Sequence, residues 1–243
     1  MSERRLPVRP NLTQLKHQAK DLLRQFRSGD PTAVEEFRKY HPEKISSSEA
    51  KLTDAQLVLA RSYEASGWTR LVLACKLIDG IWRGDLETVR SIIERNPKLL
   101  HENAGIRNSN WGPPMSYAAN LGRDAIIRML YEHGARDLEH AIGRATLQGK
   151  IEIAEWLVEK GADVNAKSTV DQNGFGGYTP LFGVVVCYAN FWGNYRGEFC
   201  DLAPLSWGDA YPAKILVSQP AMRMLQNEAG GHKSYPQDGS RFE

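Results

Sequence analysis

The chain has 243 residues, of which 42% are hydrophobic and 25% are charged. This is the composition of a folded globular protein, and the length suffices for one domain or two small ones. The formal net charge of +2 excludes a strong positive field over the whole molecule, and no apolar run reaches the ~20 residues that cross a bilayer.

The N-terminus and the cysteines indicate the compartment. The first residues are charged and no apolar stretch follows them, so we expect no secretory signal. Cys75, Cys187 and Cys200 are an odd number without C-x-x-C pairing, which predicts neither a disulfide framework nor a zinc site. We therefore expect a cytoplasmic protein in a reducing environment.

An amphipathic helix is predicted over residues 11–27. Its apolar face consists of Leu12, Leu15, Ala19, Leu22, Leu23 and Phe26. The opposite face carries the basic side chains Lys16, Lys20, Arg24 and Arg27, and Arg4, Arg5 and Arg9 precede the helix. Charged faces opposite an apolar face are normal on surface helices, so we favour an N-terminal cap with a solvated outer face over a phosphate-binding strip.

Three windows of thirteen residues follow one pattern, at residues 84–96, 122–134 and 149–161. Each window opens at a glycine, and apolar residues at offsets 4, 5, 7, 8 and 9 form one broad helical face. The aligned columns are Thr88/Ile126/Ile153, Val89/Ile127/Ala154, Ser91/Met129/Trp156, Ile92/Leu130/Leu157 and Ile93/Tyr131/Val158. Gly134 and Gly161 close two windows and suit a left-handed helix end, so the pattern predicts three amphipathic helices.

A turn and a short helix with proline in its first turn recur at residues 112–119, 177–182 and 202–207. Fainter copies of the glycine-led window lie at residues 29–37 and 221–231. Together these elements predict a chain built from repeated helix pairs.

This order of elements resembles the ankyrin repeat, whose period is ~33 residues. The stretch Gly-Ala-Asp-Val-Asn-Ala at residues 161–166 and the whole repeat at residues 112–134 carry the resemblance best, and it covers residues 76–167. Residues 11–16 and 51–58 are similar to the helical leader of uncharacterised bacterial ankyrin-repeat proteins. The resemblance implies an all-α fold, an α-solenoid of stacked helix–turn–helix repeats with an N-terminal helical cap.

We predict a helical leader at residues 1–75, a repeat array at residues 76–231 and a polar tail at residues 232–243. Gly122 and Gly149 are 27 residues apart, about 6 fewer than the repeat period, so the junction at residues 134–141 has no room for a full β-turn finger. Residues 167–177 are expected to form a longer finger. Regular stacking is expected to break at residues 188–201, which are aromatic and rich in glycine.

No motif of catalysis or metal binding is recognised. Residues 143–150 differ from a phosphate-binding loop, since five residues separate the glycines and Ile151 replaces the required hydroxyl. We interpret His133, Glu139 and His140 as a surface cluster and predict no enzyme, metal or cofactor. A less favoured interpretation places an enzyme site in the aromatic region at residues 188–207, although no nucleophile–base pair is visible. Its candidate residues are Glu198, Cys200, Asp201 and Asp209.

The resemblance implies a scaffold that binds another protein through finger tips and inner helices. Carried onto this chain, it points to the contact residues Asn108, Asn110, Trp111, Tyr117, Asn120, Asp171, Asn173, Phe175 and Tyr178. Trp111 lies at a finger tip, where it either anchors a partner or folds back to brace its own turn. We expect a monomer with a protein partner of unknown identity. The alternative is a nucleic-acid-associated regulator that uses the basic N-terminal helix, which lacks interleaved aromatic residues.

Overall fold

The computed structural model describes residues 4–107, 109, 111–168, 170, 177, 179, 180 and 182, and the structural statements below concern these residues. The helices in this part of the chain are α1 (Leu12–Arg27), α2 (Pro31–Tyr40), α3 (Leu52–Ser62), α4 (Trp68–Arg83), α5 (Leu86–Arg95), the 3-10 helix η1 (Pro97–Leu100), α6 (Pro114–Asn120), α7 (Asp124–Glu132), α8 (Leu138–Leu147) and α9 (Ile151–Glu159). No strand occurs among the described residues, which confirms the prediction of an all-α fold.

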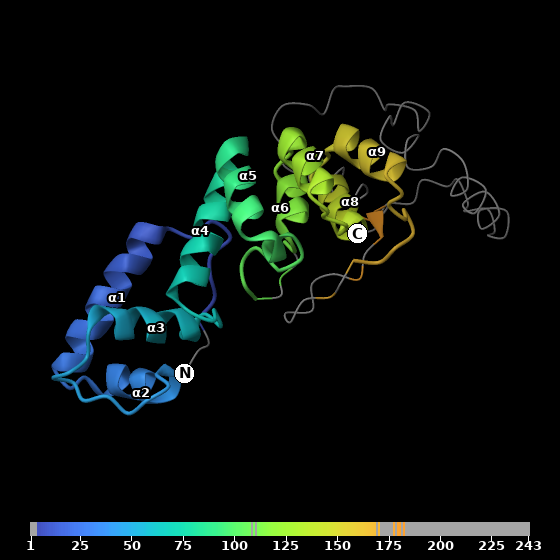
Figure 1. Cartoon of the computed structure of the whole chain (residues 1–243). Helices are drawn as coiled ribbons and strands as arrows, with labels where there is room; N and C mark the ends of the chain where they lie inside the picture. The colour runs from blue at the N-terminus through green and yellow to red at the C-terminus, as the bar shows by residue number, and fades with distance from the viewer. Residues whose placement is uncertain are drawn as a thin grey trace, which may run out of the picture.

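The helices α1, α2 and α3 form a leader at one end of the molecule (Figure 1). The predicted first helix is confirmed, since α1 begins after Asn11, whose side chain accepts a hydrogen bond from the backbone N–H of Gln14 at 3.1 Å. The leader has a hydrophobic core of its own, in which the rings of Phe26 and Phe37 stack with their centroids 3.7 Å apart. The four basic side chains on the opposite face of α1 are exposed, as expected.

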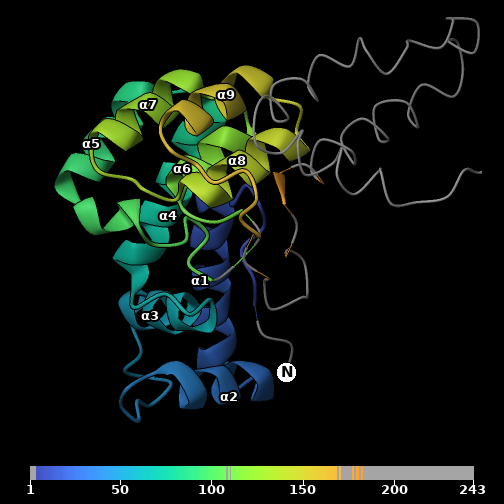
Figure 2. The ribbon, with the colours of Figure 1, turned by 90° about the vertical axis from the view of Figure 1, so that its right-hand side faces the viewer.

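The rest of the described chain is a stack of helix pairs in two layers. Figure 2 shows the outer helices α5, α7 and α9 in one layer and the inner helices α4, α6 and α8 in the other. The three predicted windows are the outer helices, and each opens at a glycine with a left-handed backbone. These are Gly84 (φ 72°), Gly122 (φ 70°) and Gly149 (φ 64°). A Cβ is strained in this conformation, so the glycines set where each inner helix turns into its outer partner.

The predicted apolar face is buried in α7 and α9 at four of its five columns, whereas in α5 Thr88, Ser91 and Ile92 are half-buried. Leu130 and Leu157 are fully buried, and Trp156 is 9% exposed. The fifth column is only partly correct, because Tyr131 is half-buried and Val158 is 37% exposed. Tyr131 packs edge-on against Trp156 of the next repeat, whereas Val158 belongs to the last described outer helix and has no described successor to cover it.

The inner helix α4 joins the two cores. Leu71 and Cys75 in its first half belong to the leader core, while Leu77, Ile78 and Ile81 in its second half belong to the repeat core. The predicted boundary after residue 75 therefore falls within one helix. The division of the chain into three domains stays a prediction.

The two connections between described repeats differ in length, as the glycine spacing predicts. Residues 133–137 join α7 directly to α8, whereas the path from η1 to α6 runs through residues 101–113. This longer loop returns to the leader, where Arg70 donates to Glu102 at 3.0 Å and Arg107 pairs with Glu64. Most of the second finger at residues 167–177, and the segments at 188–201 and 221–231, lie outside the described residues. No helix within the described ranges has the length and apolarity needed to cross a membrane.

Candidate functional site

The inner helices place three polar side chains in the same position of successive repeats. Asp79 on α4, Tyr117 on α6 and Arg144 on α8 each precede the left-handed glycine of their repeat by five residues. Because α4 packs on α6 and α6 on α8, these residues form a column across the repeats. We call Asp79, Tyr117 and Arg144 the inner column.

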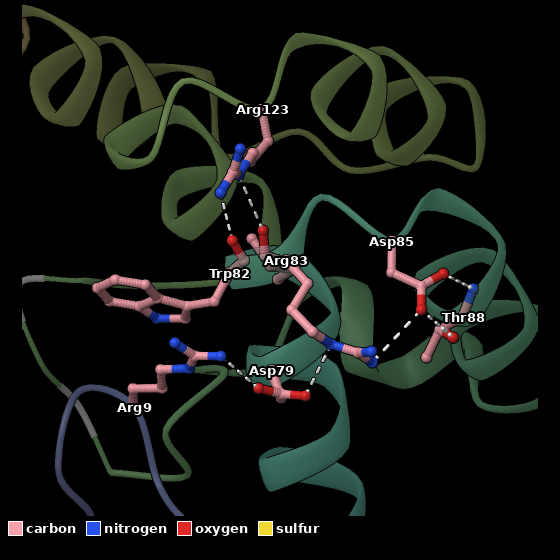
Figure 3. A network of polar contacts seen from close by, with 8 residues as sticks. Arg9, Asp79, Trp82, Arg83, Asp85, Thr88 and Arg123 are labelled. Atoms are coloured by element: carbon pink, nitrogen blue, oxygen red, sulfur yellow. Dashed lines mark hydrogen bonds and ion pairs between the residues drawn. The ribbon is translucent and has the colours of Figure 1, made fainter.

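The segment that precedes α1 lies against the first two members of the inner column. Arg9 pairs with Asp79 at 2.9 Å, and its guanidinium lies 5.5 Å from the ring centroid of Trp82 (Figure 3). The backbone carbonyl of Val8 accepts a hydrogen bond from the hydroxyl of Tyr117 at 2.7 Å. A stretch of polypeptide without regular structure is thus held on the inner helices by an ion pair, a cation–π contact and a backbone hydrogen bond.

The end of α4 that carries this contact surface is fixed by neighbouring side chains. Arg123, which precedes α7, donates to the backbone carbonyls of Ile81 and Trp82 in the last turn of α4 (Figure 3). Arg83 bridges Asp79 at 2.9 Å and Asp85 at 3.3 Å. The position of Trp82 is therefore set by the next repeat as well as by its own helix.

Trp111 is not a free finger tip. It is half-buried, with its ring centroid 6.3 Å from that of Trp82 and 4.7 Å from that of Tyr117. The guanidinium carbon of Arg144 lies 5.1 Å from the Trp111 centroid. Of the two interpretations of Trp111, the structure favours folding back, but the ring packs against α4, α6 and α8 rather than against its own turn alone.

Tyr117 and Asn120 do not stand on an open surface, contrary to the expectation. Tyr117 is 2% exposed and Asn120 is 6% exposed, because α8 packs along α6 and Trp111 lies over Tyr117. Burial raises the pKa of the Tyr117 hydroxyl, so it is an O–H donor at any physiological pH. The amide oxygen of Asn120 accepts a hydrogen bond from the guanidinium of Arg144. Their predicted role in binding a partner stays a prediction.

Of the inner column, the sequence indicated Tyr117 but neither Asp79 nor Arg144. Arg144 is 8% exposed, and burial lowers the pKa of its guanidinium. Residues 143–150 include Arg144 but do not match a phosphate-binding loop. Arg144 precedes Gly149 by five residues, just as Tyr117 precedes Gly122. This equal spacing is the sequence signal that identifies Arg144 as an inner-column residue.

His140 lies one turn before Arg144 on α8 and is half-buried. Burial, together with the positive charge of Arg144, lowers the pKa of His140 to about 4, so the ring is neutral near pH 7. It stands against Gly112, where a Cβ would come within 2.5 Å of the ring. His133 faces Glu94 on α5 instead, at 3.6 Å. The two histidines thus belong to different surroundings, and the described residues hold no group of three side chains suited to a metal ion.

The comparison with protein families agrees with this architecture. The family model described as ankyrin repeats (3 copies) matches residues 71–168. These residues are an ankyrin-repeat array. The match begins in α4 and ends beyond α9, so the three pairs α4/α5, α6/α7 and α8/α9 fall within it. No curated protein matches the chain significantly.

The remaining predicted contact residues of the ankyrin array fall outside the description. Asn108, Asn110, Asp171, Asn173, Phe175 and Tyr178 are not among the described residues. The same holds for residues 188–207 and for the acidic and cysteine candidates of the enzyme interpretation. The described part of the array therefore offers the inner column, Trp82 and Trp111 as its candidate contact surface.

Proposed function

We propose that the chain binds a partner protein through the inner helices of its ankyrin array. Ankyrin repeats are generally modules of protein–protein interaction, which supports a binding role and leaves the surface to be assigned. The observation that carries the assignment is the polypeptide already present there: Val8 and Arg9 contact Tyr117, Asp79 and Trp82. The inner helices therefore possess the donors, acceptors and aromatic faces that recognise an extended peptide segment.

The held segment is suited to displacement. Arg9 and Asp79 keep 50% and 40% of their side-chain surface exposed, and an ion pair of this kind contributes about 0–1 kcal/mol. Val8 is 41% exposed and contributes only its carbonyl to the contact. A partner segment that makes the same contacts and adds its own can replace residues 8 and 9 at small cost.

Rigid presentation is the mechanism that we infer. The inner helices are fixed by the repeat core and by Arg123, so little backbone ordering opposes association when a partner binds. Most of the entropy that is lost on binding then belongs to the partner segment. A preorganised array of this kind needs no catalytic group, in accord with the predicted scaffold role.

Site-specific photo-crosslinking tests the proposal. A photoreactive residue replaces Lys76, which is exposed on α4 one turn before Asp79, and the matched control carries it at Ala125, which is exposed on the outer helix α7. We expect one defined partner to crosslink from position 76 and not from position 125. The purified partner should then bind the Asp79→Ala variant at least several-fold more weakly. Equal crosslinking from both positions, or unchanged affinity for Asp79→Ala, would contradict the proposed surface.

A further inference from the structure

Arg144 is a buried cation that has no carboxylate partner among the described residues. It is 8% exposed, and its guanidinium forms no ion pair with any aspartate or glutamate of the described chain. Its polar contact is the hydrogen bond to the amide oxygen of Asn120. Arginines that are this deeply buried are almost always paired, because transferring an unbalanced charge out of water is costly. The described residues therefore supply no counter-charge to the Arg144 guanidinium.

Two unpaired hydrogen-bond donors lie in the same cluster as this charge. The Nε of Arg144 and the indole Nε1 of Trp82 are both buried without a hydrogen-bond partner among the described residues, and the Nδ1 of His140, a donor or an acceptor according to the tautomer, is unpaired there as well. The three side chains belong to one cluster, since Trp111 stacks on Trp82 and lies under Arg144, and His140 adjoins Arg144. Donors that are buried and unpaired favour a ligand that supplies acceptor oxygens.

A peptide that lies along the inner column reaches Arg144 after Asp79 and Tyr117. The N-terminal segment occupies Asp79 with the Arg9 side chain and Tyr117 with the Val8 carbonyl. Arg144 holds the equivalent position in the third repeat and forms no hydrogen bond or ion pair with Val8 or Arg9. A peptide that crosses all three repeats meets an acidic side chain, a hydroxyl donor and then an unpaired guanidinium.

We propose that Arg144 receives the carboxylate of an aspartate or glutamate in the partner segment, which makes an acidic peptide the ligand of the third repeat. The inference rests on the proposed function and adds the chemistry of the partner to it. The planar guanidinium matches the two oxygens of a carboxylate, and Trp111 holds it from one side. A polyphosphate chain fits less well, because Asp79 places a negative charge in the same column.

The test uses the full chain labelled with ¹⁵N and two acetylated, amidated tetrapeptides, Gly-Glu-Glu-Gly and Gly-Gln-Gln-Gly. The Glu peptide should shift the Nε–H resonance of Arg144 in a saturable way and bind about tenfold or more tightly than the Gln peptide, as expected for a charge-assisted hydrogen bond. Arg144→Met should lose this preference. This comparison of two peptides on the unmodified chain needs no folded variant.

Arg128→Met is the matched control. The Arg128 guanidinium also lies over a tryptophan, at 4.9 Å from the Trp156 centroid, but it is already paired with Asp124 at 2.8 Å. This variant should keep the preference for the Glu peptide. Equal binding of the two peptides, an unmoved Arg144 resonance, or a preference that survives Arg144→Met would overturn the inference. A larger shift with an oligothymidylate than with the Glu peptide would also overturn it, in favour of nucleic acid.

The crosslinking experiment separates this inference from the proposed function. A partner that crosslinks at position 76 and needs Asp79, but binds Arg144→Met as tightly as the unmodified chain, leaves the proposed function intact and removes the acidic ligand. If the Glu peptide alone shifts the Arg144 resonance but no partner crosslinks from position 76, the acidic-ligand site at Arg144 stands and the proposed binding surface is contradicted.

Discussion

Two arginine–tryptophan pairs of the array have the same chemistry and opposite surroundings. On the outer helices Arg128 lies 4.9 Å from the Trp156 centroid, and on the inner helices Arg144 lies 5.1 Å from the Trp111 centroid. The outer arginine keeps 45% of its side chain exposed and pairs with Asp124, whereas the inner arginine is 8% exposed and has no acidic partner among the described residues. A tyrosine adjoins each tryptophan, Tyr131 outside and Tyr117 inside.

The pKa shifts of the two arginines express this difference. The hydrogen bond that Arg128 donates to Asp124 raises the pKa of Arg128, while burial lowers the pKa of Arg144. The outer pair is electrostatically complete and serves the stability of its layer. The inner pair is incomplete, and an incomplete buried charge is the property expected of a binding position.

Removal of the two tryptophans should give the largest effects. Trp156 is 9% exposed and belongs to the repeat core, so Trp156→Ala should lower the free energy of unfolding by about 3–5 kcal/mol. Trp111 is half-buried, and Trp111→Ala should cost about 1–3 kcal/mol through its aromatic and guanidinium contacts. Urea denaturation followed by circular dichroism measures both. A larger loss for Trp111→Ala would mean that the inner cluster carries more of the stability than its burial indicates.

Low pH should lower the stability of the fold through His140, which lies on the inner helix α8. Its pKa is about 4 in the folded chain against an ordinary value of 6.5, so between these values the unfolded chain binds a proton that the folded chain does not. Stability contributed by neutral His140 is complete above pH 6.5 and is lost as the pH falls to 4, by at most about 3 kcal/mol.

Urea denaturation at pH 7 and pH 4.5 should show this loss, and His140→Gln should remove the part that is due to His140. A ¹⁵N titration of the imidazole gives the pKa directly. A value near 6.5 would place His140 in contact with water and refute this account of the cluster.

Removal of the tyrosine hydroxyl should destabilise the protein at Tyr117 on the inner helix α6 more than at Tyr131 on the outer helix α7. Tyr117→Phe removes the hydrogen bond to the Val8 carbonyl and should cost about 1 kcal/mol, with faster amide exchange in residues 6–10. The hydroxyl of Tyr131 has no hydrogen-bond partner in the described chain, so Tyr131→Phe should change stability little. If both variants exchange alike, Tyr117 does not hold the N-terminal segment.

The smallest effect is expected at the outer arginine. Arg128→Gln removes an exposed ion pair between residues four apart on one helix, which contributes about 0.3–0.5 kcal/mol. The difference from the unmodified chain should shrink between 50 mM and 500 mM NaCl, because salt screens exposed charges. A difference that does not change with salt would show that Arg128 acts through its contact with Trp156 rather than through Asp124.

The outer helices were predictable because the residues that determine them lie close together in the sequence. An apolar face with helical spacing and a glycine that accepts positive φ fix the limits of α5, α7 and α9 within a window of thirteen residues. The shortened junction before α8 followed from the same spacing. The prediction for Val158 was wrong, since this residue of the last described outer helix is 37% exposed.

The inner column was not predictable in the same way, because each of its contacts joins distant parts of the chain. Tyr117 meets Val8 across 109 residues, and Arg123 reaches the carbonyl of Trp82 across 41. The polar turn before Trp111 predicts a finger tip, whereas the Trp111 ring stacks on Trp82 and packs at a tilt against Tyr117.

The sequence by itself determined the helices, their turns and their repeat, since hydrophobic periodicity and glycine conformation act over a few residues. The tertiary structure alone decided that Arg144 is buried, that it forms no ion pair with an acidic side chain of the described chain and that the N-terminal segment occupies the first two positions of the inner column. Burial and charge pairing are sums over all neighbours in space, and three stacked repeats and the leader supply those neighbours.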